Sequence, residues 1–130
     1  MNMYSKMVMN IPIQAPSMSD TLAFIEQRIE AKVFTQHVVV NAGKIVAMQG
    51  DAVLAQSVLD ADIINADEMS VVWASRFSGK ALPSRVAGID LMLELVKRAH
   101  KCGYRCCFFG AKQEVIEKVV TILQKSFHPI

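Results

Sequence analysis

Short β-prone runs alternate along this chain with longer segments of helical periodicity, and this alternation constrains its fold more than any other feature. Three of the runs are expected to be buried strands of a sheet: residues 37–41, 62–65 and 105–109. The first has the continuous apolar, β-branched centre of a strand that is buried on both faces. Helical segments of ten or more residues separate the three runs, which is typical of β-α-β units with parallel strands. We therefore expect an α/β protein with an open, Rossmann-like, three-layer fold and a mostly parallel sheet.

Capping residues and glycines mark the ends of the expected helices. Ser17 and Asp20 have the spacing of a capping box, so a helix is predicted over residues 18–32. Asp51 follows Gly50 and is expected to cap a new helix after an interruption. A β-prone stretch is expected from Met7 to Ile13, ending near Pro12 and Pro16. Three further helices are expected: one over residues 68–78, one from Ile89 to a stop at Gly103, and one from Gly110 onward. Residues 79–87 are expected to form a loop.

Length and charge limit the kinds of protein that the chain can form. With 130 residues, 52% of them hydrophobic, it is long enough to bury a core without a metal or a disulfide, so a single domain over residues 1–130 is expected. The 14 Lys and Arg residues nearly balance the 12 Asp and Glu residues, which leaves a net charge of +2. This balance argues against a nucleic-acid-binding protein and against an acidic, disordered one.

Cysteines and histidines show no pattern of a cross-link or a metal site. Cys102, Cys106 and Cys107 are odd in number, and the last two lie in an apolar run, where cysteine behaves as a small buried hydrophobe. No pair has the C-x-x-C spacing and the histidines are scattered, so neither a metal nor another cofactor is expected. The N-terminus is too short and polar for a secretory signal, and no apolar run reaches about 18 residues, so we expect a cytoplasmic protein.

Three residues follow the expected strands at the edge where open parallel sheets bind ligands: Asn41, Asp67 and Gly110. Two of them also have a purely structural interpretation, because Asp67 is placed to cap a helix from Glu68, and asparagine commonly ends a strand. Free amides at the helix start after Gly110 are suited to bind phosphate. Neither G-x-G-x-x-G nor G-x-x-x-x-G-K-[ST] occurs, which disfavours a dinucleotide-binding oxidoreductase and a P-loop protein.

Two charged residues near the expected loop are further candidates. Arg85 is either a solvated loop cation or a side chain that grips a diphosphate with two hydrogen bonds. Asp90 is expected in the first turn of its helix, where the helix dipole favours a carboxylate whether or not it binds a ligand. The local pattern leaves both interpretations open for each residue.

Five segments, taken in order, resemble a known protein family. They are Val38–Ala42, the pair Ala66-Asp67, VVWASR at residues 71–76, RVAGIDL at residues 85–91 and FFGA at residues 108–111. Together they look like the TagA/WecG/CpsF glycosyltransferases, and RVAGIDL is the most specific of the segments. These bacterial enzymes include the N-acetylmannosaminyltransferases of wall teichoic acid synthesis and relatives that build enterobacterial common antigen, capsule and exopolysaccharide.

The resemblance implies a reaction and roles for particular residues. Family members transfer an N-acetylmannosamine-type sugar from a UDP donor to a polyprenyl-diphosphate-linked amino sugar at the cytoplasmic face of the membrane, invert the anomeric centre and require no metal. Their proposed general base corresponds to Asp67, the asparagine of their sugar pocket to Asn41, and the arginine beside the diphosphate or the acceptor to Arg85. We include Asp90 and Gly110 as candidate substrate-binding residues.

The chain departs from the family in its motif and in its length. The family's Ala-Asp-Gly-x-Gly reads Ala-Asp-Glu-Met-Ser here, with Glu68 and Ser70 in place of the glycines, and Val39 stands where threonine is common. Family members are longer, and their later portion carries a basic appendage that meets the membrane. We therefore expect an N-terminal portion with little activity alone, peripheral membrane contact through the missing part, and a homo-oligomer formed through exposed apolar surface. The alternative is a non-catalytic nucleotide- or protein-binding α/β domain.

Overall fold

The computed structural model describes residues 5–14, 16–67, 79 and 86–127. The chain forms two compact units, Met1–Leu91 and Met92–Ile130, and the sheet belongs to the first. The helix predicted over 68–78 and most of the loop predicted over 79–87 lie outside the described residues. No helix within the described ranges is both long and apolar enough to cross a membrane.

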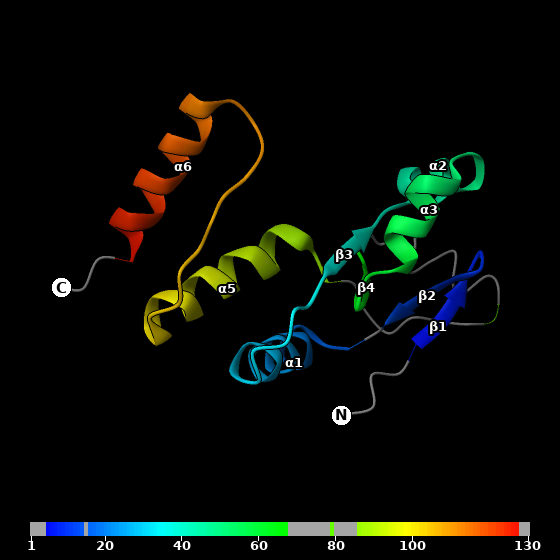
Figure 1. Cartoon of the computed structure of the whole chain (residues 1–130), viewed down its shortest axis with the longest axis horizontal. Helices are drawn as coiled ribbons and strands as arrows, with labels where there is room; N and C mark the ends of the chain where they lie inside the picture. The colour runs from blue at the N-terminus through cyan, green and yellow to red at the C-terminus, as the bar shows by residue number, and fades with distance from the viewer. Residues whose placement is uncertain (1–4, 15, 68–78, 80–85, 128–130) are drawn as a thin grey trace. The chain divides into compact units, whose positions relative to one another are not determined.

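Four short strands form the sheet of the first unit (Figure 1): β1 (Ser5–Val8), β2 (Ile11–Gln14), β3 (His37–Val40) and β4 (Ile63–Ala66), in the order β1-β2-β4-β3. β1 and β2 are antiparallel, whereas β4 pairs in parallel with both β2 and β3. The predicted mostly parallel α/β sheet is therefore confirmed. The strands expected over 37–41 and 62–65 correspond to β3 and β4.

The β-prone stretch predicted near the N-terminus is a two-stranded hairpin. Met9 and Asn10 connect its strands, and both have positive φ, 47° and 64°, as a two-residue type I′ turn requires. β2 ends at Gln14, between Pro12 and Pro16, so the predicted end of the stretch is confirmed, with Pro12 inside the strand. A proline offers no N–H to a neighbouring strand, and the described pairing of β2 with β4 lies beyond it, where Gln14 is opposite Asn65.

Among the described residues, the first unit contains three complete helices, α1 (Met18–Glu30), α2 (Ala42–Gly50) and α3 (Ala52–Leu59). The capping box predicted for α1 is confirmed: the Asp20 N–H donates to Ser17 Oγ at 3.1 Å, and the Ser17 N–H donates to Asp20 Oδ2 at 3.4 Å. Asp51 caps α3 as predicted, because its Oδ1 accepts the Leu54 N–H at 2.9 Å. These caps satisfy backbone donors that a helix start leaves without partners.

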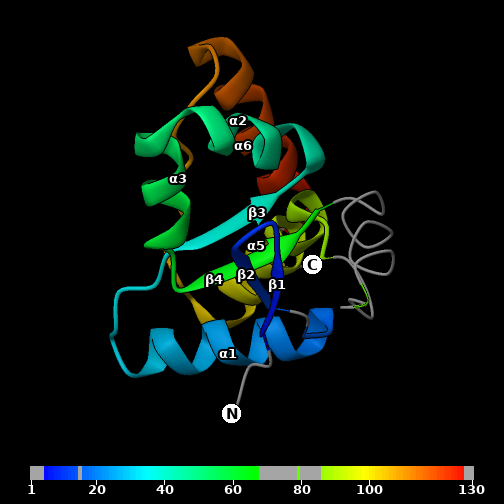
Figure 2. The ribbon, with the colours of Figure 1, turned by 90° about the vertical axis from the view of Figure 1, so that its right-hand side faces the viewer.

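The first unit has three layers (Figure 2). α2 and α3 cover one face of the sheet, and α1 lies on the opposite face. Side chains alternate between the two faces along each strand. On the side of α2 and α3, the core joins apolar residues of the strands and helices, including Val40, Ile64, Ala66, Ile45, Met48 and Val58. The predicted three-layer arrangement is therefore confirmed for this unit.

The second unit contains most of α5 (Gly88–Cys102), which begins in the first unit, and α6 (Gln113–Ser126). α5 ends where Gly103 adopts a φ of 73° and the Tyr104 N–H donates to the Ala99 carbonyl oxygen at 2.8 Å. This is the αL ending that glycine favours, so the predicted stop is confirmed.

The third predicted strand, over residues 105–109, is wrong. The segment has no regular structure, and Phe109 is fully exposed. Cys106 and Cys107 are exposed rather than buried, contrary to expectation. A β-prone run becomes a strand only when it pairs with another strand and buries side chains, and in the described part of the chain this run pairs with none.

Candidate functional site

Asn41 and Asp67 directly follow two neighbouring strands of the sheet. β3 and β4 are parallel and in register, with Val40 opposite Ala66, and the Asp67 N–H continues the ladder by donating to the Val40 carbonyl oxygen at 2.9 Å. Carboxyl ends of parallel strands meet at one edge of a sheet, where open α/β folds bind ligands. The structure therefore brings Asn41 and Asp67 together at this edge, which is the candidate site.

Asn41 also caps the helix that follows it. Its Oδ1 accepts the Lys44 N–H at 2.8 Å, which holds the side chain over the first turn of α2. The structural interpretation of Asn41 is therefore correct, and it is compatible with ligand binding because it uses only Oδ1. No acceptor within the described residues takes the Nδ2 hydrogens, so the amide can donate to a ligand.

Asp67 links the end of β4 to the beginning of α5. Its half-buried carboxylate accepts the Gly88 N–H at 2.8 Å through Oδ1. An N–H at a helix start suits a negative charge, both through the hydrogen bond and through the helix dipole. The two residues are 21 positions apart, so this is a tertiary contact. The alternative cap, on a helix from Glu68, falls outside the described residues.

Gly88 allows α5 to approach the strands closely. A Cβ atom at this position would lie 3.2 Å from Val39 Cγ2 and 3.8 Å from Asp67 Oδ1. The first distance is shorter than an ordinary contact between carbon atoms, so a side chain would push the start of α5 away from β3. The sequence analysis does not identify Gly88 as a site residue, although it lies within the RVAGIDL segment.

We expect Gly88→Val to lower the free energy of unfolding by about 1–3 kcal/mol, the usual cost of forcing extra carbon atoms into a packed region. Gly50, the last residue of α2, has no atom within 4 Å of its Cβ position, so Gly50→Val is the matched control. The control should change stability by less than about 0.5 kcal/mol. Urea unfolding measures both variants, and equal losses would contradict the tight approach at Gly88.

Besides Asn41 and Asp67, three residues are predicted for the site: Asp90, Gly110 and Arg85. Asp90 is exposed in the first turn of α5, where its charge suits the helix start. Gly110 belongs to the second unit, with a φ of 124°, and the strand expected before it is absent, so its role in binding stays a prediction. Arg85 lies outside the described residues.

A chain of hydrogen bonds crosses the sheet from β3 through β4 to β2. Asn65 is 1% exposed, and its Nδ2 donates to the Gln14 carbonyl oxygen at 3.2 Å. Its Oδ1 therefore faces His37, whose Nε2 donates to it at 2.7 Å. Gln14 closes the chain by accepting the Ile64 N–H at Oε1, at 2.6 Å. Burial lowers the pKa of His37 below its ordinary value of 6.5, and the hydrogen bond with Asn65 offsets part of this effect.

This lowered pKa predicts a pH-dependent stability. Below pH 6.5 the unfolded chain binds a proton at His37 more readily than the folded chain, so the free energy of unfolding falls as the pH falls through this window and levels off above it. Glutamine can still donate to Asn65 but does not titrate, so the free energy of unfolding of His37→Gln should depend less on pH than that of the wild type. Urea unfolding at pH 5.5 and 7.5 tests this, and parallel profiles for the two proteins would refute it.

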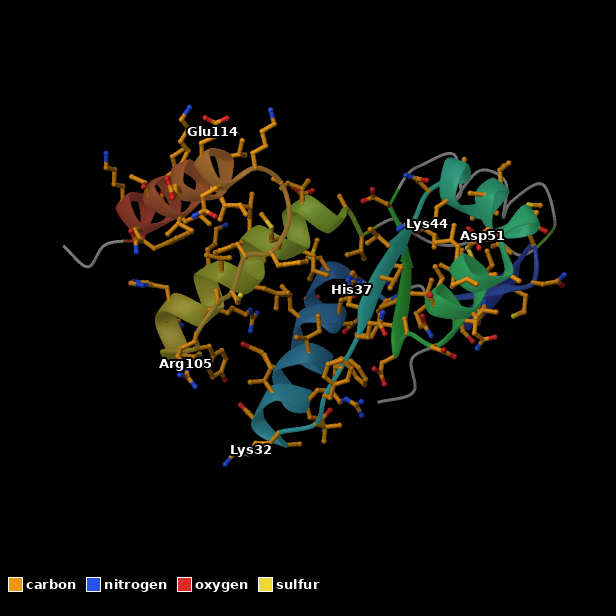
Figure 3. The ribbon with its side chains drawn as sticks, turned by 45° about the horizontal axis from the view of Figure 1, so that its top comes forward. Lys32, His37, Lys44, Asp51, Arg105 and Glu114 are labelled. Carbon is orange, nitrogen blue, oxygen red and sulfur yellow. The ribbon has the colours of Figure 1, made fainter. Side chains whose placement is uncertain are left out.

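Lys44 is a cation that the sequence analysis misses. Its side chain folds back from the first turn of α2, and Nζ donates to the Val39 carbonyl oxygen at 2.8 Å. Figure 3 shows Lys44 where β3 runs into α2, whereas His37 lies at the other end of the strand. Its spacing from Asn41, three positions into the same turn, is the signal that could have identified it.

Comparison with known proteins now identifies the family. The chain matches the glycosyl transferase WecG/TagA/CpsF family over residues 6–130. The chain belongs to this family. The resemblance inferred from the five sequence segments is therefore confirmed.

Two curated relatives of this WecG/TagA/CpsF chain carry the same name, N-acetylglucosaminyldiphosphoundecaprenol N-acetyl-beta-D-mannosaminyltransferase. The protein from Bacillus subtilis (strain 168) is 28% identical over 126 residues, which cover 96% of this chain and 49% of that protein. The protein from Bacillus spizizenii (strain ATCC 23059 / NRRL B-14472 / W23) is 37% identical over 67 residues, which cover 52% of this chain and 26% of that protein. The chain thus spans about half the length of the Bacillus subtilis relative.

Proposed function

We propose that this chain is the N-terminal part of an inverting glycosyltransferase. It would move an N-acetylmannosamine-type sugar from a UDP donor to a polyprenyl-diphosphate-linked amino sugar. The observation that carries the proposal is that Asn41 and Asp67 follow the carboxyl ends of the neighbouring strands β3 and β4, in a chain of the WecG/TagA/CpsF family. The names of the two Bacillus relatives support it, since they specify a mannosaminyl group and an undecaprenol diphosphate.

In this proposal Asp67 acts as the general base. Its carboxylate takes the proton of the acceptor hydroxyl while the hydroxyl oxygen forms a bond to the anomeric carbon of the sugar. The bond from that carbon to the UDP oxygen breaks at the same time, and UDP leaves with the electron pair. Attack from the face opposite UDP inverts the anomeric centre. Negative charge grows on the leaving group, so positive groups near the diphosphate lower the barrier.

The remaining roles follow the family correspondence. Asn41 would hold the sugar through its Nδ2 hydrogens, and Arg85 would contact the diphosphate or the acceptor, with Asp90 and Gly110 as further binding candidates. The proposal includes no metal and no other cofactor. It places the reaction at the cytoplasmic face of the membrane, with the peripheral membrane contact made outside these 130 residues.

A non-catalytic nucleotide- or protein-binding domain is the second candidate. Glu68 and Ser70 favour it, because they replace family glycines directly after Asp67. The Glu68 carboxylate would repel a second negative charge beside the base, and its side chain adds bulk where the family has a glycine.

Isothermal titration calorimetry with UDP and UDP-N-acetylmannosamine tests the transferase proposal first. We expect the purified chain to bind both, and no nucleotide binding at any tested concentration would contradict it. The second step joins this chain to the C-terminal half of the Bacillus subtilis relative and measures transfer to a polyprenyl-diphosphate acceptor. UDP binding with no transfer by a folded fusion would favour the non-catalytic domain.

A further inference from the structure

The described part of the first unit offers few cations for the candidate site. Its described Lys and Arg residues are Lys6, Arg28, Lys32 and Lys44. Lys6 lies within β1, and Arg28 pairs with Asp62 at 3.1 Å, at the opposite end of the strands. Lys32 follows the end of α1. Among these four, Lys44 is the one that follows the carboxyl end of a core strand, three residues after Asn41.

Two hydrogen bonds fix Lys44 at this edge. Its backbone N–H donates to Asn41 Oδ1 and its Nζ donates to the Val39 carbonyl oxygen, each at 2.8 Å. Carbonyl groups alternate in direction along a strand. Because the Val40 carbonyl oxygen points to β4, where it accepts the Asp67 N–H, the Val39 carbonyl oxygen points to the other side of β3. β3 ends the described strand order, so the ammonium group lies on its open side.

The ammonium group of Lys44 has spare binding capacity. A lysine carries three N–H donors, and the described contacts use one of them. No ion pair joins Nζ to a carboxylate of the described residues. A half-buried cation with free donors and no acidic partner is suited to an anionic ligand.

We propose that Lys44 binds a diphosphate group of a substrate through Nζ. This inference rests on the proposed function, whose donor and acceptor each carry a diphosphate. Lys44 would stabilise that group as a point charge, next to the Asn41 amide that holds the sugar. The contact with Val39 limits the freedom of the lysine side chain before the ligand arrives, so less conformational entropy is lost on binding.

Calorimetry with UDP and uridine separates a diphosphate contact from a structural role. Lys44→Met keeps the apolar stem and removes the charge, so we expect UDP affinity to fall about 10- to 100-fold while uridine affinity is unchanged. Lys44→Arg should keep most of the UDP affinity. Lys32→Met is the matched control, because it removes one charge at the end of α1 and should leave both affinities unchanged.

Titration with farnesyl diphosphate and farnesol provides the second arm. If Lys44→Met lowers the affinity for farnesyl diphosphate but not for UDP, the diphosphate that Lys44 contacts is that of the lipid acceptor. The inference is overturned if Lys44→Met weakens the binding of uridine and farnesol as much as that of UDP and farnesyl diphosphate, or if it weakens the binding of none of them. Lys44 would then have only a structural role, through its bond to Val39. A wild-type chain that binds neither UDP nor farnesyl diphosphate would instead contradict the proposed function itself, so the two failures are distinguishable.

Discussion

We expect Asp67→Asn to lower the turnover number for sugar transfer by about 10²- to 10⁴-fold, the usual contribution of a positioned general base. Asparagine keeps an oxygen that can accept the Gly88 N–H, now at 2.8 Å, so the link from β4 to α5 is preserved. Asparagine cannot take up a proton at neutral pH, so the substitution removes the proposed base. The measurement is the initial rate of N-acetylmannosamine transfer to a polyprenyl-diphosphate acceptor, in the fusion with the C-terminal half of the Bacillus subtilis relative.

Asp60→Asn is the matched control for this substitution. Asp60 is exposed at the end of α3 and accepts a hydrogen bond from Gln56 at 2.6 Å, away from the carboxyl edge of the sheet. Its variant should transfer sugar at the wild-type rate. UDP affinity should be the same for Asp67→Asn and wild type, since the base contacts the acceptor. Urea unfolding should show a loss of about 1 kcal/mol or less, because asparagine keeps the bond to Gly88 but loses the interaction of the charge with the helix start. A wild-type rate for Asp67→Asn would remove Asp67 from the role of base.

The fold of the first unit, and the positions of Asn41 and Asp67 within its site, could be predicted because short stretches of sequence determine them. Ser17 and Asp20 mark the start of α1 within four residues, and Asp51 marks the start of α3. Asn41 and Asp67 each follow a buried strand directly, and parallel topology then requires the two strand ends to meet at one edge. No distant contact is needed for that conclusion.

The features that could not be predicted depend on residues far apart in the sequence. Gly88 reaches Asp67 across 21 positions, and Asn65 reaches the Gln14 backbone across 51. Lys44 is a different case: it is only five positions from Val39, but the sequence does not show that its side chain folds back onto β3. The run over 105–109 shows the converse: its β propensity is clear, but propensity makes no strand unless the fold supplies a partner.

The contacts of Asn65 lead to the largest stability effect that we expect. Asn65→Ala should lower the free energy of unfolding by about 2–4 kcal/mol, because the Gln14 carbonyl oxygen and His37 Nε2 both lose their partner in or near the core. The lost side chain also leaves a cavity on the face of β4 that Asn65 shares with Ile63, which is 0% exposed. Urea unfolding at pH 7.5 measures the change.

Gln56→Ala is the matched amide deletion, since Gln56 is exposed and its side chain bonds only to Asp60 within the described residues. It should cost less than about 0.5 kcal/mol. Asn65→Ala should also remove the link between His37 and β4, so combining it with His37→Gln should cost less than the sum of the two single changes. The hydrogen-bond chain across β3, β4 and β2 would contribute little to stability if the two losses in the free energy of unfolding were strictly additive. The same would follow if Asn65→Ala were as stable as Gln56→Ala.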